Sequence, residues 1–333
     1  MSIRQQREQL EKTIIGPYGV LACESRGRLT DEPECEIRTC FQRDIDRITH
    51  SKAFRRLKHK TQVFLQPEGD HYRTRLTHTL EVSRLARTVS RALMLNEDLT
   101  EAISLGHDLG HTPFGHAGER ALAELYSGGF THYEQSLRVV DCLEKDGRGL
   151  NLCYETRMGI LNHTLGSPED TREATVVRLC DWIAFVNHDL DDSIRAGILT
   201  DDEVPAYIRK YVGTSNSQRI DTLVTDLIAN SGDGEIHMSD EMWDIFMNFK
   251  AYMYSDIYTN PIAKGEESKV FGLIEKLYDH YRNNTELLPD EYRAIALTDS
   301  PERAAVDYIS GMTDTFAIDK YEQLYIPFSW KVK

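Results

Sequence analysis

The chain has 333 residues, of which 40% are hydrophobic and 28% charged, a balance typical of a folded globular protein that excludes a disordered one. Its formal net charge of −15 argues against a protein that coats nucleic acid, because such proteins usually present a positive surface. The length suffices for one large domain or two smaller ones with a substantial core.

Targeting segments and disulfides are not indicated. No apolar stretch approaches the roughly 18 residues of a membrane helix, and residues 1–12 are too polar and charged for a secretory signal. The six cysteines show no C-x-x-C pair and no framework spacing, so reduced thiols are expected. These features predict a cytoplasmic protein that does not enter a membrane.

Helical patterns dominate the chain, which has no repeat or low-complexity segment. Residues 16–40 lack periodicity and predict a loop, residues 41–60 predict an amphipathic helix, and residues 61–74 predict a short β-hairpin with a turn at 67–70. Further helices are predicted at 76–94, 97–109, 116–127, 132–145, 172–190, 216–230, 239–258, 266–283 and 301–319. The sequence therefore predicts an all-α globule with at most a short β-hairpin.

Basic side chains crowd between residues 43 and 60, where only Asp44 and Asp46 oppose seven arginines and lysines. A local basic patch on an acidic protein suits a compact polyanion such as a nucleoside triphosphate. The alternative is a solvated helix face, which is the commoner meaning of a charge run.

The segment 105–111 (Leu-Gly-His-Asp-Leu-Gly-His) is the most informative part of the sequence. Adjacent His107 and Asp108 bring an imidazole and a carboxylate into one small volume, which suits a divalent transition metal. His107 falls on the buried side of its helix. Burying the Asp108 carboxylate there is costly unless it is paired or bound to a metal.

Two distant side chains can complete this site. His78 lies on the apolar face of the predicted helix 76–94, and Asp181 lies in an apolar helix that would not tolerate an unpaired charge. A single histidine on an apolar face is more often a core residue than a ligand, and Arg178 could pair with Asp181 instead. With His107 and Asp108, however, the two residues predict a metal site with open positions for water and substrate.

Further titratable groups surround the predicted ligands. His116 opens a new helix with Glu119 three residues later, so the carboxylate can orient the imidazole of a general acid or base. The alternative for this pair is a surface cap. His111 follows His107 by four residues, and Arg75 lies about one helical turn before His78, where a guanidinium could clamp a metal-bound phosphate.

Phe185 and Asp189 follow Asp181 at intervals of four residues, on one stripe of the predicted helix. If Asp181 holds the metal, both side chains are expected to line the pocket. Because Asp191 and Asp192 come next, a solvated helix end is the alternative for Asp189.

With these residues in place, the sequence resembles the HD-domain deoxynucleoside triphosphate triphosphohydrolases, most closely the bacterial dGTPase-like proteins. The resemblance is dense over residues 17–190, returns near the C-terminus and is thin between. The segments that carry it are 41–48, 53–64, 72–82, 106–116, 132–138 and 307–314. A bare His-Asp pair would be a weak signal, whereas this ordered set is specific.

The resemblance implies one divalent metal per site, most readily Mn²⁺, with Mg²⁺, Fe²⁺, Zn²⁺ and Ni²⁺ as further candidates. The ligands that it implies are His78, His107, Asp108 and Asp181. By the same resemblance His116 is the catalytic histidine with Glu119 as its partner, and His111 is a further active-site histidine.

The implied substrate contacts are also specific. Gln62 and Asp189 match positions that hold the deoxyribose 3′-hydroxyl, and Arg75 matches a phosphate contact. Two positions depart from the family pattern. Phe185 stands where these enzymes usually have a tyrosine under the sugar ring, and Trp182 stands where bacterial members generally have a second aspartate.

The function that this resemblance implies is metal-dependent hydrolysis of a dNTP, such as dGTP, to a deoxynucleoside and inorganic tripolyphosphate. Alternatives are an HD-type phosphodiesterase or nuclease, and a nucleotide-sensing regulatory protein with little turnover. A homo-oligomer and a nucleotide or single-stranded DNA effector are implied as well. The expected organisation is a loop-rich segment 1–40, an HD metal-dependent phosphohydrolase core 41–200, and a helical portion 201–333 packed on that core.

Overall fold

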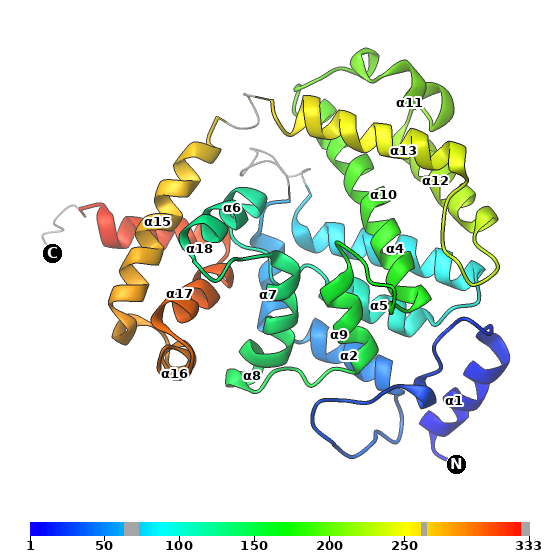
Figure 1. Cartoon of the computed structure of the whole chain (residues 1–333), viewed down its shortest axis with the longest axis horizontal. Coiled ribbons are helices and arrows are strands. Elements are labelled where there is room, and N and C mark those ends of the chain that lie inside the picture. Colours follow the sequence, from blue (N-terminus) through cyan, green and yellow to red (C-terminus); the bar gives the residue numbers. More distant parts are fainter. Residues whose placement is uncertain (63–72, 261–264, 328–333) are drawn as a thin grey trace, which may run out of the picture.

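Helices build the architecture of the protein, whose computed structural model describes residues 1–62, 73–260 and 265–327 (Figure 1). The helices are α1 (Ile3–Ile14), α2 (Cys40–Thr49), α3 (Lys52–Arg56), α4 (Arg75–Ala92), α5 (Glu97–Gly106), α6 (Gly115–Leu125), α7 (His132–Arg138), α8 (Glu144–Gly147), α9 (Tyr154–Asn162), α10 (Arg172–Arg195), α11 (Ala206–Tyr211), α12 (Asn216–Asn230), α13 (Asp240–Tyr252), α15 (Glu267–Asn283), α16 (Asp290–Thr298), α17 (Pro301–Ser310) and α18 (Asp314–Tyr325). The all-α prediction is confirmed. Of the predicted hairpin, Thr61 and Thr74 form an isolated antiparallel bridge, and the turn at 67–70 lies outside the described residues.

Two predicted helices were wrong as continuous elements, because polar caps divide each of them. Within 41–60, the Ser51 hydroxyl accepts the backbone N–H of Phe54 at 3.1 Å and starts α3 after α2 has ended. Within 301–319, Thr313 caps α18 in the same way. Serine and threonine at these positions satisfy otherwise unpaired N–H groups at the start of a helix.

Four shorter helices, α1, α9, α11 and α16, were not predicted. The start of α1 carries a signal that the sequence does offer, a capping box in which Ser2 and Gln5 satisfy each other's backbone N–H groups. α9 gives a weaker signal because polar Glu155 and Thr156 are buried together with Gly159 and Ile160. Periodicity of apolar residues does not detect a helix whose buried face is partly polar.

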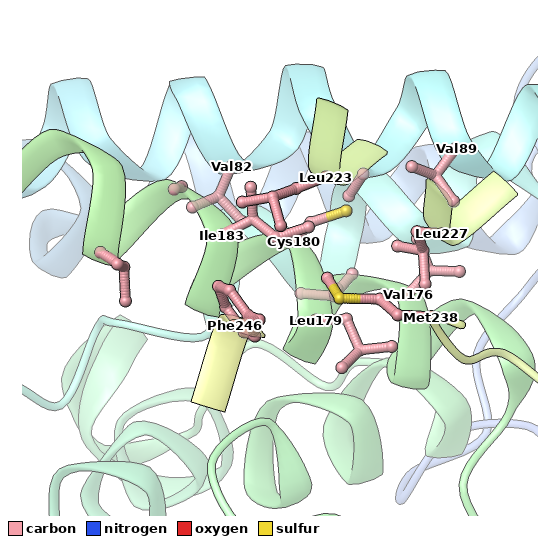
Figure 2. Packing of buried hydrophobic residues seen from close by; sticks show 14 of the residues in the cluster. Val82, Val89, Val176, Leu179, Cys180, Ile183, Leu223, Leu227, Met238 and Phe246 are labelled. Carbon is pink, nitrogen blue, oxygen red and sulfur yellow. The ribbon is translucent and has the colours of Figure 1, made fainter. Parts of the chain in front are cut away.

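The core lies where α4, α5 and α10 pack against one another, with α12 alongside. Figure 2 shows Val82 of α4 beside Cys180 and Ile183 of α10, and Leu223 of α12 in the same layer. Each fully buried aliphatic side chain contributes about 1.5–3 kcal/mol. His78 lies on α4, His107 directly follows α5 and Asp181 lies on α10, so this core holds the three helices that carry the predicted ligands.

A second apolar cluster joins α6 to the C-terminal helices. Leu122 of α6 packs with Ile274 and Leu277 of α15 and with Ile309 of α17. In Figure 1 these C-terminal helices lie at one end of the molecule and α1 lies at the other. No helix in the described part of the chain combines the length and the apolar character that crossing a bilayer requires.

The basic side chains of residues 43–60 lie in different environments. Arg43 and Arg47 both pair with the Glu32 carboxylate, and Lys52, Arg55 and Lys58 are exposed. The solvated-face alternative is therefore correct for the exposed side chains. Lys60, in contrast, is buried.

The Lys60 ammonium donates to the backbone carbonyls of His111 and Ser310. Burial lowers the pKa of Lys60 to about 7. Lys60 thereby links the segment after α5 to the end of α17. Because Lys60 is buried, it is not part of a basic surface patch with the other basic side chains of residues 43–60.

Candidate active site

A cavity of about 510 Å³ opens between α4, α6 and α10 and the segment after α13. Nine of the eleven predicted site residues line it, namely Gln62, Arg75, His78, Asp108, His111, His116, Glu119, Asp181 and Phe185. His107 and Asp189 lie behind its wall, fully buried. A volume of this size accommodates a small-molecule ligand.

The four predicted metal ligands come together. His78 Nε2 lies 3.0 Å from Asp181 Oδ1, and His107 Nε2 lies 3.4 Å from Asp108 Oδ1 and 3.7 Å from Asp181 Oδ1. Two donors that share one cation at about 2.1 Å lie about 3.0–3.4 Å apart. Two of the three separations fall in this range and the third, between His107 and Asp181, is slightly longer, and His78, His107 and Asp108 together form a group that could hold one ion. Two imidazoles with two carboxylates suit a transition metal.

Hydrogen bonding orients His107 for such a role. Its Nδ1 lies 2.6 Å from the Ser104 carbonyl oxygen, which can only accept, so Nδ1 carries the proton and Nε2 carries the lone pair. That Nε2 atom is buried and has no hydrogen-bond partner. Metal-binding histidines are typically oriented in this way. The alternative pairing of Arg178 with Asp181 is not realised, because Arg178 pairs with Asp170 at 3.2 Å.

Asp108 has cationic and polar neighbours on both oxygens. Oδ2 accepts from Arg75 Nη1 at 2.9 Å, and Oδ1 lies 3.1 Å from His111 Nε2. Burial by itself would raise the pKa of Asp108, but His107, His111 and Arg75 together hold that pKa well below its usual range. The carboxylate is therefore ionised and available as a ligand.

Arg75 is 2% exposed, and its Nε has no hydrogen-bond partner. Its guanidinium reaches the cavity past Gly115, which adopts a φ of +55°. A Cβ atom at Gly115 would come within 3.3 Å of Arg75 Nη2. The glycine therefore leaves room for the guanidinium as well as adopting a left-handed conformation.

Glu119 bridges two imidazoles. Its Oε2 lies 3.1 Å from His116 Nδ1, and its Oε1 lies 2.8 Å from His132 Nδ1. Burial opposes ionisation, yet the hydrogen bonds from His116 and His132 lower the pKa of Glu119 strongly. His116 is 54% exposed on the cavity wall, whereas Glu119 is 15% exposed. The pair is therefore part of an inward-facing network and not only a surface cap.

Two histidines of this network were missed. His132 stacks on His111 with ring centroids 4.1 Å apart, and its Nε2 lies 3.3 Å from His163 Nε2. His132 begins one of the motifs at 132–138, a signal that could have been used. Nothing in the local sequence singles out His163, whose pKa burial lowers to about 3.

Tyr258 joins the two predicted sugar contacts on α10. Its ring stacks on Phe185 at 5.4 Å, and its hydroxyl donates to Asp189 Oδ2. Asp189 is 1% exposed, and burial raises its pKa well above the usual range. The solvated helix end is therefore wrong for Asp189, which contacts Tyr258 of the cavity wall. Gln62 also lines the cavity, and its Oε1 is buried without a hydrogen-bond partner among the described residues.

Lys250 of α13 was also missed, because nothing in its local sequence marks it. Its Nζ lies 3.3 Å from the centre of the Trp182 ring, on the cavity wall. Within the described part of the chain, no carboxylate lies close enough to form an ion pair with it. Burial lowers the pKa of Lys250 to about 8. Trp182, one of the departures from the family pattern, thus supports a cation in the cavity.

Comparison with known proteins identifies the family. The HD domain model matches residues 75–185, and the phosphohydrolase-associated domain model matches residues 236–323. The chain is 51% identical over 331 residues to a deoxyguanosinetriphosphate triphosphohydrolase-like protein of Caldanaerobacter subterraneus subsp. tengcongensis, covering 99% of this chain and 98% of the relative. The chain belongs to the deoxyguanosinetriphosphate triphosphohydrolase-like proteins. Its membership of the HD-domain phosphohydrolases follows from the same matches.

Other deoxyguanosinetriphosphate triphosphohydrolase-like proteins are similar over their full length. That of Desulfatibacillum aliphaticivorans is 48% identical over 347 residues, covering 98% of this chain and 99% of the relative. That of Clostridium perfringens strain 13 is 47% identical over 337 residues, covering 98% of each chain. The HD match begins at Arg75 and ends at Phe185, so all four predicted metal ligands lie inside it, whereas Lys250 and Tyr258 lie inside the associated-domain match.

Asp314 connects the associated domain to two walls of the cavity. Its Oδ2 accepts the backbone N–H of Thr61 at 3.0 Å, and its Oδ1 accepts that of Phe114 at 2.9 Å. Asp314→Ala leaves these groups unpaired, so we expect the free energy of unfolding to fall by about 2–4 kcal/mol in urea titrations. Asp319→Ala, an exposed change on the same helix, is the control and should stay within about 0.5 kcal/mol. Equal stability of the two variants would contradict the assigned role.

Proposed function

We propose that the protein hydrolyses deoxynucleoside triphosphates, dGTP among them, at the α-phosphorus and releases a deoxynucleoside and inorganic tripolyphosphate. The observation that carries the proposal is the convergence of two imidazoles and two carboxylates beside the His116–Glu119 pair in one cavity. The names of the relatives support a purine deoxynucleotide as substrate.

His78, His107, Asp108 and Asp181 would hold the metal, for which we propose Mn²⁺. A divalent cation held by these residues would lower the pKa of a bound water and would polarise a phosphoryl oxygen.

The chain's own residues supply orientation and proton transfer. Glu119 accepts from His116 Nδ1, which leaves the exposed Nε2 of His116 to exchange a proton with the departing 5′-oxygen. Arg75 donates to the phosphate bound next to Asp108. Gln62 and the Tyr258–Asp189 pair would contact the sugar, and Gln62 Oε1 can accept a hydrogen bond from its 3′-hydroxyl.

The triphosphate also requires positive charge beyond the metal site. Lys250, which has no ion-pair partner among the described residues, offers an ammonium there. Lys250→Ala is expected to raise KM for dGTP about 10- to 100-fold, the effect of losing one charged hydrogen bond, with a smaller change in kcat. Lys210→Ala is a matched control, because Lys210 also lies over an aromatic ring, that of Tyr211, but is exposed. Equal KM values for the two variants would contradict phosphate binding by Lys250.

The direct test incubates the purified protein with each dNTP and rNTP in the presence of Mn²⁺ and measures released tripolyphosphate. Tripolyphosphate from dGTP supports the proposal. Mononucleotides released from oligonucleotides would support the phosphodiesterase or nuclease alternative. Nucleotide binding without any product would support the regulatory alternative.

Other sequence expectations stay predictions. They are the homo-oligomer, the nucleotide or single-stranded DNA effector, the cytoplasmic location and the division into segments 1–40, 41–200 and 201–333. We propose that the last of these segments closes one side of the active site, because Lys250, Tyr258 and Asp314 all come from it.

A further inference from the structure

Four of the six cysteines line a second cavity, of about 320 Å³, whose wall is formed by α1, the segment after it and the start of α2. They are Cys23, Cys35, Cys40 and Cys153. No residue of this wall lines the active-site cavity. Within the described part of the chain, the cavity offers no three ligand atoms close enough to share one metal ion. The chemistry that this cluster can support is therefore that of thiols.

Cys35 is the reactive thiol of the cluster. It is partly exposed in the segment that precedes α2. The backbone N–H groups of Arg38 and Ile37, together with the Arg38 guanidinium, lower the pKa of Cys35 to about 7. Roughly half of the Cys35 side chain is therefore thiolate at pH 7, and the thiolate is the form that attacks an oxidant.

α1 holds the backbone of Cys35 at the cavity. Arg4 Nε donates to the Cys35 carbonyl oxygen, and the Arg4 backbone N–H donates to the Glu36 carbonyl oxygen, each at 3.0 Å. Arg4 itself lines the cavity. A cysteine that is held in place, accessible and largely ionised, with other thiols nearby, has the surroundings of a redox-sensitive cysteine.

Cys40, the first residue of α2, is the best placed second thiol. Four residues separate it from Cys35, and they form neither helix nor strand, so this segment can bend to bring the two sulfurs together. Cys40 Sγ lies 3.3 Å from the Ala22 carbonyl oxygen, on the wall of the same cavity. Burial raises the pKa of Cys23, and a hydrogen bond with Cys40 raises the pKa of Cys153, so these two thiols attack more slowly.

We propose that this cavity is a site of reversible thiol oxidation, in which a hydroperoxide oxidises Cys35 and Cys40 then forms a disulfide with it. In the first step the Cys35 sulfur attacks a peroxide oxygen, the O–O bond breaks, and the leaving oxygen takes up a proton as water or an alcohol. In the second step the Cys40 sulfur displaces hydroxide from the Cys35 sulfenic acid, and the proton lost by Cys40 converts that hydroxide to water. The two sulfurs together lose two electrons, which the peroxide gains.

The test treats the reduced full-length protein with hydrogen peroxide, alkylates the remaining thiols and maps disulfides by mass spectrometry. The wild-type protein should lose two of its six free thiols, yield a linked peptide pair that contains Cys35 and Cys40, and regain both thiols with dithiothreitol. Before oxidation, iodoacetamide at pH 7 should alkylate Cys35 about tenfold faster than Cys142. Burial raises the pKa of Cys142, so its thiolate fraction is much smaller.

Three variants separate the two steps. Cys35→Ser should keep all of its remaining thiols after the same treatment. Cys40→Ser should form the Cys35 sulfenic acid without a disulfide, and dimedone traps that acid. Cys142→Ser is the matched control, because Cys142 is an exposed cysteine outside the cavity, and it should form the Cys35–Cys40 disulfide as the wild-type protein does. Circular dichroism confirms that each variant is folded.

An unchanged thiol count in the wild-type protein after peroxide treatment would overturn the inference. Loss of two thiols in Cys35→Ser, or a disulfide that lacks either Cys35 or Cys40, would overturn it as well. The proposed function fails separately: a protein that releases tripolyphosphate but forms no disulfide loses only this inference, and the reverse result loses only the proposed reaction.

Discussion

Replacing Asp108 with asparagine is expected to lower the rate of phosphate ester hydrolysis at least about 10³-fold and to remove bound divalent metal. The amide keeps the volume of the side chain but loses the charge that faces His107, His111 and Arg75. A steady-state rate with dGTP and Mn²⁺, measured together with metal content, tests both parts of the expectation.

Asp202→Asn is the control for this charge change, because Asp202 is exposed far from the cavity and forms only a loose ion pair with Arg209, at 3.5 Å. It should keep the wild-type rate and metal content. An undiminished rate in Asp108→Asn would dismiss the metal site and, with it, the proposed hydrolysis.

Replacing His116 with alanine is expected to reduce kcat about 10²- to 10⁴-fold, the usual contribution of a positioned general acid, while metal content stays unchanged. His116 lies on the cavity wall and contacts Glu119, and it is not among the predicted metal ligands. Glu119→Gln should have a smaller effect on kcat, because the amide can still accept a hydrogen bond but no longer stabilises a charged imidazole.

His50→Ala is the control for loss of an imidazole, since His50 is exposed at the end of α2 and its Nδ1 lies 2.7 Å from the Asp46 carbonyl oxygen. It should leave kcat unchanged. If His116→Ala loses metal in step with activity, His116 is a ligand and the acid–base assignment is wrong.

The structure shows another source for the hydroxyl group that Phe185 lacks. From sequence, Phe185 lacks a hydroxyl that the family usually has at this position. In the fold, the Tyr258 ring stacks on Phe185 and brings a hydroxyl to Asp189. A tyrosine hydroxyl is therefore present beside Asp189, supplied by the segment after α13.

The sequence by itself determined the all-α fold, because apolar residues recur with helical periodicity along α4, α10 and α12. It also predicted the candidate metal ligands, because a buried aspartate beside a histidine, or alone in an apolar helix, is costly without a partner. Gln62, in contrast, was a candidate only through the family resemblance. The sequence analysis missed the helix starts that Ser51 and Thr313 cap, because a single capping hydrogen bond does not alter the hydrophobic pattern.

Only the tertiary structure decided which groups face the cavity. His163, Lys250 and Tyr258 carry no local signal, and their surroundings come from helices far away in the chain. The same holds for Asp189, which reads as a helix end but is buried against Tyr258. Burial and charge pairing depend on long-range packing, whereas periodicity depends on neighbours three or four residues away, so the pattern reveals the helices and the packing reveals the site.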